Sequence, residues 1–260
     1  METLDSLKSG LASGRLAGAT SLKLCDGLRE FPSALFALAD SLTFLNLSDN
    51  QLTELPADFD RFGQLEIVFF NNNRFKQFPT VLANCPNLSM VSFKNNAIAR
   101  INPQALFSQI RWLILTNNKL KSLPTSIGTL PRLQKCMLAG NQLTSVPQEL
   151  ANCKNLELIR LSANQLETFP DWLLALPRLS WIAYAGNPFY SAELVSQKTQ
   201  ALQTIPADEL TFGEVLGQGA SGVIYKGFWH QKDSVDSGEP KTSGLENSQT
   251  VAIKLFKGDI

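Results

Sequence analysis

A segment of 23 residues repeats along most of the chain. Its most regular letter is an asparagine, and successive copies of this asparagine are 23 residues apart, except for one step of 22. A period of this size is typical of a solenoid, in which each repeat packs against its neighbours. The seven asparagines are Asn50, Asn73, Asn96, Asn118, Asn141, Asn164 and Asn187.

The letters around each asparagine keep the same spacing. Residues 65–79 read Leu-x-x-Val-x-Phe-x-x-Asn-x-Phe-x-x-Phe-Pro, and residues 133–147 read Leu-x-x-Cys-x-Leu-x-x-Asn-x-Leu-x-x-Val-Pro. This pattern resembles the leucine-rich repeat family, with seven good copies and a degenerate first copy at residues 22–32. The resemblance implies an α/β horseshoe, in which each of about eight repeats adds one strand to a parallel concave sheet.

Each letter of the pattern has a physical role. The alternating apolar pair predicts a short strand. Asparagine has two donors and an acceptor on a short stem, so at a buried turn it can satisfy backbone groups of adjacent coils. Proline cannot donate to a ladder and ends the strand side of the repeat. We therefore expect all seven asparagines to be structural.

The repeats are expected to occupy residues 19–190, preceded by a helical cap at 1–18. Leu4, Leu7 and Leu11 have helical spacing within residues 2–16, which predicts a helix that covers the open end of the repeat core. Residues 191–208 are expected to form a capping helix or linker, with a short helix at 191–204.

The side chains between the buried letters of each strand must face the concave side, and many of them are apolar. Isolated apolar residues on a surface are normal, but nine on adjacent strands would form a contiguous patch, and such patches mark interaction sites. The sequence therefore predicts a protein partner on this face. The nine residues are Phe44, Ile67, Phe69, Met90, Trp112, Ile114, Met137, Leu158 and Trp181.

Composition narrows the partners and the compartment. Lys plus Arg equals Asp plus Glu at 23 each, without a long basic run, so nucleic acid is not expected as a partner. Residues 188–208 contain no apolar run that could cross a membrane, and the first residues do not resemble a signal peptide. The four cysteines, with Cys85 and Cys153 three repeats apart, are expected to be structural. We expect a cytoplasmic protein.

A different pattern begins at residue 209. Residues 216–229 read Leu-Gly-Gln-Gly-Ala-Ser-Gly-Val-Ile-Tyr-Lys-Gly-Phe-Trp. Dinucleotide-binding folds and phosphate loops use similar glycine spacing, but a dinucleotide fold places a helix after the glycines, whereas these β-branched and aromatic letters predict a strand. Together with Val-Ala-Ile-Lys at 251–254, the hairpin resembles the start of a protein kinase domain, here residues 209–260.

This resemblance implies an ATP site. The glycines would let backbone approach the phosphates, Leu216 and Ile224 would sandwich the adenine beside Ala252, and Lys254 would contact the α- and β-phosphates. A β-hairpin without a ligand is the structural alternative. The implied ATP-binding residues are Leu216, Gly217, Gln218, Gly219, Ala220, Ser221, Gly222, Val223, Ile224, Ala252 and Lys254.

The pattern departs from the family in three places. Ser221 replaces a common aromatic, and a polar insert separates Trp229 from Thr250, with the single histidine, His230, expected as a solvated loop residue at its start. No His-Arg-Asp or Asp-Phe-Gly occurs before Ile260, so magnesium ligands would lie further along. We expect the N-terminal portion of a serine/threonine kinase acting on a protein substrate, inactive as it stands; the alternative is a non-catalytic repeat scaffold with a kinase remnant.

Overall fold

The computed structural model describes residues 2–189, 205–219, 222–230 and 248–256. The chain divides into two compact units, Met1–Leu194 and Val195–Ile260, and each is described by itself. The short helix expected at 191–204 falls outside the described residues, as does most of the polar insert. Within the described ranges, no helix is long and apolar enough to cross a bilayer.

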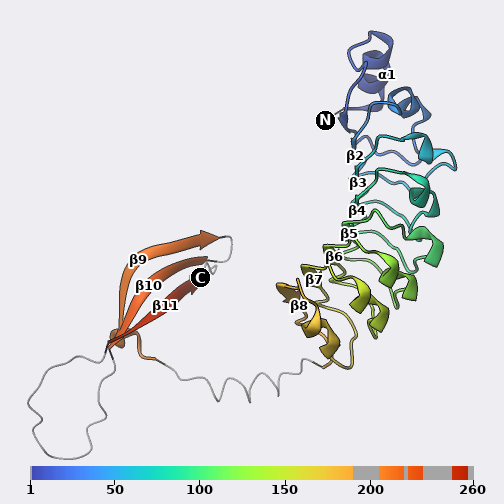
Figure 1. The fold of residues 1–260 in the computed structure, drawn as a ribbon. Coiled ribbons are helices and arrows are strands. Elements are labelled where there is room, and N and C mark those ends of the chain that lie inside the picture. Colours follow the sequence, from blue (N-terminus) through green and yellow to red (C-terminus); the bar gives the residue numbers. More distant parts are fainter. Residues whose placement is uncertain (1, 190–204, 220–221, 231–247, 257–260) are drawn as a thin grey trace, which may run out of the picture. The chain divides into compact units, whose positions relative to one another are not determined.

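The first unit is a solenoid with one strand per repeat (Figure 1). Its eight strands are parallel and follow chain order across the sheet, as the repeat pattern predicted. They are β1 (Ser21–Lys23), β2 (Phe44–Asn46), β3 (Ile67–Phe69), β4 (Met90–Ser92), β5 (Trp112–Ile114), β6 (Lys135–Met137), β7 (Leu158–Arg160) and β8 (Trp181–Ala183).

The convex side of each repeat is a short 3-10 helix. Proline precedes five of these helices, where its fixed dihedral directs the chain out of the strand layer. The helices are η1 (Ser33–Leu38), η2 (Phe59–Arg61), η3 (Thr80–Asn84), η4 (Pro103–Ala105), η5 (Thr125–Thr129), η6 (Gln148–Asn152) and η7 (Asp171–Ala175).

The fourth repeat has asparagine where six of the other repeats have proline, and it is also the repeat with the 22-residue step. Asn102 caps η4 by accepting a hydrogen bond from the Gln104 amide at 3.0 Å. The helix is two residues shorter than η3 and η5, while Met90 still pairs with Trp112 across the sheet. The convex return therefore absorbs the missing residue and the strand register is kept.

The seven repeat asparagines form a ladder of side-chain hydrogen bonds, which confirms their structural role. Asn141 is representative: its Nδ2 donates to the carbonyls of Leu115 and Leu138, both at 2.9 Å, and its Oδ1 accepts from the Leu120 amide at 3.0 Å. Each asparagine thus satisfies backbone groups of its own coil and of the preceding ones. Six of the seven are buried, where an unpaired backbone group would be costly.

Phenylalanine fills much of the core in the N-terminal half of the solenoid. The rings of Phe70 and Phe93 stack at 5.1 Å, and Phe75 meets Phe93 edge to face at the same distance. Such pairs stabilise by about 1 kcal/mol beyond the burial of their area. The larger rings replace leucine at equivalent repeat positions, so the aromatic contacts pass from one repeat to the next.

A helix covers the N-terminal end of this core. The structure has α1 at Leu4–Ala12, shorter than the expected 2–16, with Leu7 fully buried and Leu4 and Leu11 packed partly buried against the core. The Thr3 hydroxyl caps the helix by accepting from the Ser6 amide at 3.1 Å. The end of the solenoid is therefore closed by a capped helix.

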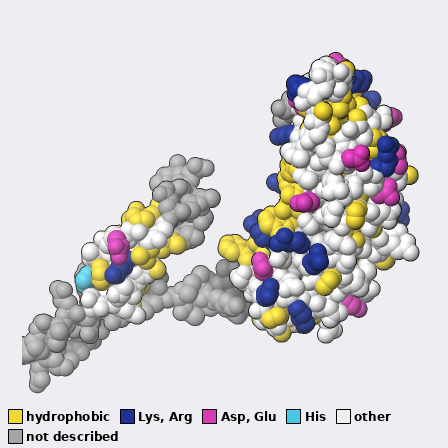
Figure 2. Space-filling view, turned by 45° about the horizontal axis from the view of Figure 1, so that its top comes forward, with side chains coloured by type: hydrophobic (Ala, Val, Ile, Leu, Met, Phe, Trp, Pro, Cys, Tyr) yellow, Lys and Arg dark blue, Asp and Glu magenta, His cyan; other side chains and the backbone are white. Residues whose placement is uncertain are grey.

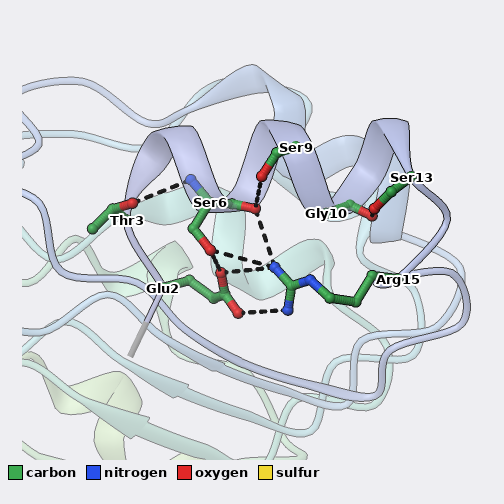
Figure 3. Close-up of polar contacts among 7 residues, drawn as sticks. All are labelled: Glu2, Thr3, Ser6, Ser9, Gly10, Ser13 and Arg15. Carbon is green, nitrogen blue, oxygen red and sulfur yellow. Dashed lines mark hydrogen bonds and ion pairs between the residues drawn. The ribbon is translucent and has the colours of Figure 1, made fainter.

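Beside α1, the Glu2 carboxylate and the Arg15 guanidinium form a bidentate pair with distances of 3.0 and 3.1 Å (Figure 3). The Ser6 hydroxyl donates to the same carboxylate. These hydrogen bonds lower the pKa of the Glu2 carboxyl from 4.5 to about 2, the Arg15 bonds being the larger cause. The pair joins the residue before the helix to the segment after it.

The four cysteines are free thiols, and three of them are buried. Burial raises the pKa of Cys85 to about 12, with a smaller effect from Asp60, and raises the pKa of Cys153 to about 11. The Cys153 thiol donates to the Ile127 carbonyl at 3.2 Å. Thiols held neutral in this way are unreactive core residues, in agreement with the structural role predicted for them.

The second unit is a three-stranded antiparallel sheet in the order β11-β10-β9, preceded by η8 (Ala207–Glu209). The strands are β9 (Leu210–Gly219), β10 (Gly222–His230) and β11 (Ser248–Phe256), so strands form where the glycine-rich and Val-Ala-Ile-Lys patterns predicted them. The Trp229 indole is buried and donates to Glu209 Oε2 at 2.9 Å.

The position of His230 differs from the prediction. It was expected in a solvated loop, but it is the last residue of β10, is half-buried, and pairs with Ser248 of β11. Its Nε2 lies 3.1 Å from the Thr211 hydroxyl. The strand extends this far because its partner β11 begins at Ser248, three residues before the first apolar letter, Val251.

Candidate protein-binding face and nucleotide site

The nine predicted concave residues lie in two rows that run across the parallel sheet. The first residue of each strand forms the first row, and the third residue forms the second. From β2 to β8 the first row is Phe44, Ile67, Met90, Trp112, Lys135, Leu158 and Trp181, and the second is Asn46, Phe69, Ser92, Ile114, Met137, Arg160 and Ala183. Six predicted residues lie in the first row and three in the second.

Eight of the nine are half-buried, and Trp181 in the terminal strand is 57% exposed. Paired residues on adjacent strands are neighbours, so the rows bring together side chains that are about 23 residues apart in sequence. Phe44 and Phe69, for example, meet edge to face at 5.4 Å. In Figure 2 hydrophobic side chains gather along the left edge of this unit, the side on which Figure 1 places the strands.

Two cations interrupt the apolar rows, and the sequence prediction did not include them. Lys135 occupies the first row in β6, and Arg160 the second row in β7. The Lys135 ammonium lies 3.7 Å from the centre of the Trp112 ring, within cation–π range. Lys135 and Arg160 occupy the same repeat positions as the apolar residues, so the repeat register alone assigns them to this face.

A second asparagine ladder, also absent from the prediction, borders the concave face. Asn72 donates to Asp49 and Asn95 donates to Asn72, both at 2.6 Å, and Asn117 donates to Asn95 at 2.8 Å. All four residues have positive φ, a conformation that asparagine and aspartate tolerate. The sequence signal for this second ladder is the residue directly before each repeat asparagine, which forms an asparagine doublet in three of these four repeats. These bonds link four successive repeats along one edge of the face.

The ladder stops at Gly140. This residue has φ +69°, and a Cβ on it would lie 2.2 Å from Asn117 Oδ1. Only glycine therefore fits both the backbone conformation and the close approach of the asparagine.

The implied ATP-binding residues fall on three adjacent strands of the second unit. Residues 216–219 lie on β9, residues 222–224 on β10, and residues 252 and 254 on β11, whereas Ala220 and Ser221 are outside the described part. Ile224 pairs with Gly217 on one side and with Lys254 on the other. The sheet thus places Gly217 of the glycine-rich segment and Lys254 on either side of Ile224, in register across three neighbouring strands.

Leu216 and Ile224 are exposed, at 58% and 38%, and Ala252 is exposed as well. Lys226 pairs with Ala252, and residues two apart on a strand share a face, so Ile224 and Ala252 lie on one face of the sheet. This face therefore carries the exposed apolar residues Ile224 and Ala252 beside the charged side chain of Lys226.

Family models described as leucine-rich repeats match residues 41–62, 108–166 and 131–189. The matched segments lie within the solenoid and include five of its strands.

Known proteins match over part of the chain. The mouse "Leucine-rich repeat and calponin homology domain-containing protein 1" is 31% identical over 111 residues, which are 42% of this chain and 16% of the relative. The "Probable serine/threonine-protein kinase pats1" of Dictyostelium discoideum is 34% identical over 104 residues, 38% of this chain and 3% of that protein. The chain therefore matches only a small part of these relatives.

Solved structures share the solenoid. A leucine-rich repeat protein of Leptospira interrogans aligns over 64% of this chain and 49% of its own, with 28% identity and a TM-score of 0.51. The ectodomain of the Arabidopsis thaliana membrane receptor kinase GASSHO1/SCHENGEN3 aligns over 67% of this chain and 22% of its own, with 26% identity and a TM-score of 0.55. The latter was solved in complex with CASPARIAN STRIP INTEGRITY FACTOR 2.

Proposed function

Because the first unit is a leucine-rich repeat solenoid, we propose that the protein recognises a protein partner through the two concave rows, and that its second unit is the start of an ATP-dependent protein kinase. The recognition unit would recruit a substrate or a regulator. We place both units in one compartment, the cytoplasm.

One observation carries the partner site: apolar side chains stand next to one another on hydrogen-bonded strands of the solenoid, on a face that no described element of the first unit covers. Scattered apolar residues would expose similar area without offering a continuous surface. Phe69 and Trp112 are aromatic members of the central strands, and aromatic residues are the usual anchors of protein interfaces. The relative from Arabidopsis was solved with its ligand, which supports the same use of this fold.

The site is tested by panning a displayed library of random peptides on the whole chain and measuring the affinity of the selected peptides. The Phe69→Ser/Trp112→Ser variant should bind them at least about tenfold more weakly, because two anchors are lost. Its unfolding free energy should fall by only about 1 kcal/mol for each lost aromatic or cation–π contact.

The matched control is Leu174→Ser, which removes an apolar side chain that is 69% exposed on η7 and belongs to neither row. It should leave the affinity unchanged. Equal affinity of the Phe69→Ser/Trp112→Ser variant would contradict the partner site, and complete unfolding would assign these side chains to the core.

A specific arrangement favours the second function. Gly217, Ile224 and Lys254 lie at one level of three neighbouring strands, and Leu216, Ile224 and Ala252 are apolar and exposed. ATP would lie with its adenine against these apolar residues and its phosphates near the glycine-rich turn, and Lys254 would pair with the phosphates. Magnesium ligands would come from residues after 260. A serine/threonine-directed kinase is our proposal, and a non-catalytic scaffold is the alternative.

A further inference from the structure

We propose that the partner segment bound by the concave face carries a carboxylate beside an apolar side chain, and that Lys135 and Arg160 bind this carboxylate together. The inference rests on the proposed partner site and specifies the chemistry of its occupant.

The charge of the two rows supports this occupant. The pairing of β1 with β2 extends the rows by Ser21 and Lys23, and the charged residues of the extended rows, Lys23, Lys135 and Arg160, are all positive. Neither Lys135 nor Arg160 forms an ion pair among the described residues, whose ion pairs are Glu2 with Arg15, Asp58 with Arg61, and Glu214 with Lys226. The face therefore offers cations without supplying their counter-charges.

The strand register places the two cations within reach of one ligand. Lys135 pairs with Leu158, and Arg160 follows Leu158 by two residues on the same face. With strands about 4.8 Å apart and a rise of about 3.3 Å per residue, the two Cα atoms are roughly 8 Å apart along a diagonal. A lysine and an arginine at this separation can both reach one carboxylate, and arginine can bind it through two parallel hydrogen bonds.

The surroundings of the pair require that an apolar group accompany the carboxylate. Lys135 is held over the Trp112 ring at 3.7 Å, and Leu158 and Met137 are the direct neighbours of the two cations in the rows. Lys135 is half-buried and Arg160 is exposed, so the carboxylate would be shielded from water only when an apolar group of the partner covers Leu158 and Met137, and a charge-assisted bond is stronger there than in water. An aliphatic or aromatic residue next to it would cover the remaining apolar surface.

More positive charge lies at the sheet edge where β5 and β6 begin. Arg111 and Arg132, with Gln134 and Asn155, line a hollow of about 340 Å³. Arg111 donates to Gln134 at 3.0 Å, and neither arginine has an ion-pair partner in the described part. Glu66 and Glu157 lie along the same edge and reduce the local charge, so selectivity is expected to come from the pair inside the rows.

The experiment uses the random displayed library on the whole chain, with the Lys135→Glu/Arg160→Glu variant panned in parallel. Wild-type protein should select peptides that contain Asp or Glu next to an apolar residue. The variant should bind these peptides roughly thirtyfold more weakly or worse, because an attraction between opposite charges becomes a repulsion. It should instead select peptides with Lys or Arg at the corresponding place.

Two controls separate charge from other effects. Lys121→Glu/Lys154→Glu makes the same change in net charge at exposed positions outside the rows, and should leave the affinity nearly unchanged. Replacing the peptide's Asp or Glu by Asn or Gln tests the same bond on wild-type protein, and should weaken binding, but by less than the double reversal, because it removes the attraction without adding a repulsion.

The outcomes distinguish the two proposals. Peptides that depend on Phe69 and Trp112 but show no acidic preference, or that tolerate the amide replacement, would overturn the carboxylate and leave the partner site standing. Selected peptides that ignore all four residues, or a library that yields no binder, would overturn both.

Discussion

Replacing Asn141 by alanine should lower the free energy of unfolding by about 3 kcal/mol, although the side chain performs no chemistry. The change removes three hydrogen bonds in the middle of the solenoid. The carbonyls of Leu115 and Leu138 keep one bond each, from Asn118 and Asn164. The buried Leu120 amide keeps none from a side chain, and such an orphaned donor costs about 1–3 kcal/mol.

Urea unfolding followed by circular dichroism measures this loss. Asn155→Ala is the matched control, because it makes the same substitution at a half-buried residue with a single side-chain bond, to the Pro131 carbonyl at 2.7 Å. It should cost no more than about 1 kcal/mol. Equal effects of the two substitutions would show that the ladder does not hold adjacent coils together.

The second large effect concerns Lys254. In a chain extended through a complete kinase domain, Lys254→Ala should reduce phosphoryl transfer by about 100-fold or more, because the α- and β-phosphates would lose their cation. The 260-residue chain itself should show no phosphoryl transfer and at most weak ATP binding, since three strands provide few contacts. Transfer of labelled phosphate to a protein substrate measures both.

Binding of the selected peptides by the Lys254→Ala chain is the control, and it should equal that of the unmodified chain because the repeats are untouched. Phosphoryl transfer at full rate by Lys254→Ala would contradict the lysine assignment. An extended chain that binds peptide but transfers no phosphate, with Lys254 intact, would support the scaffold alternative.

The sequence was most informative where its pattern is periodic. Each core letter, such as Leu115 or Asn141, occupies an equivalent position in every repeat, so seven copies define strand register and outward-facing residues. The convex returns were not predictable in the same detail, because their letters vary and a 3-10 helix of three to six residues has no distinct period. Asn102 shows this: it replaces proline and forms a cap of its own.

The candidate sites were predictable in position but not in completeness. The apolar pattern predicted that Trp112 lies on the concave face but did not include Lys135, whose ammonium lies directly over the Trp112 ring. The contact joins positions on neighbouring strands, so only pairing between repeats reveals it. His230 was misplaced for a related reason: its pairing with Ser248 depends on a strand that begins 18 residues later.

The most direct test of the concave partner site is methyl NMR of methionine. The chain has three methionines, and two of them, Met90 in the first row and Met137 in the second, lie on the proposed surface. With 13C-labelled methyl groups, addition of a selected peptide should shift both resonances as the complex saturates, and Phe69→Ser/Trp112→Ser should suppress the shifts in proportion to the lost affinity. A peptide that binds tightly while the resonances of Met90 and Met137 stay unchanged would contradict recognition by this face.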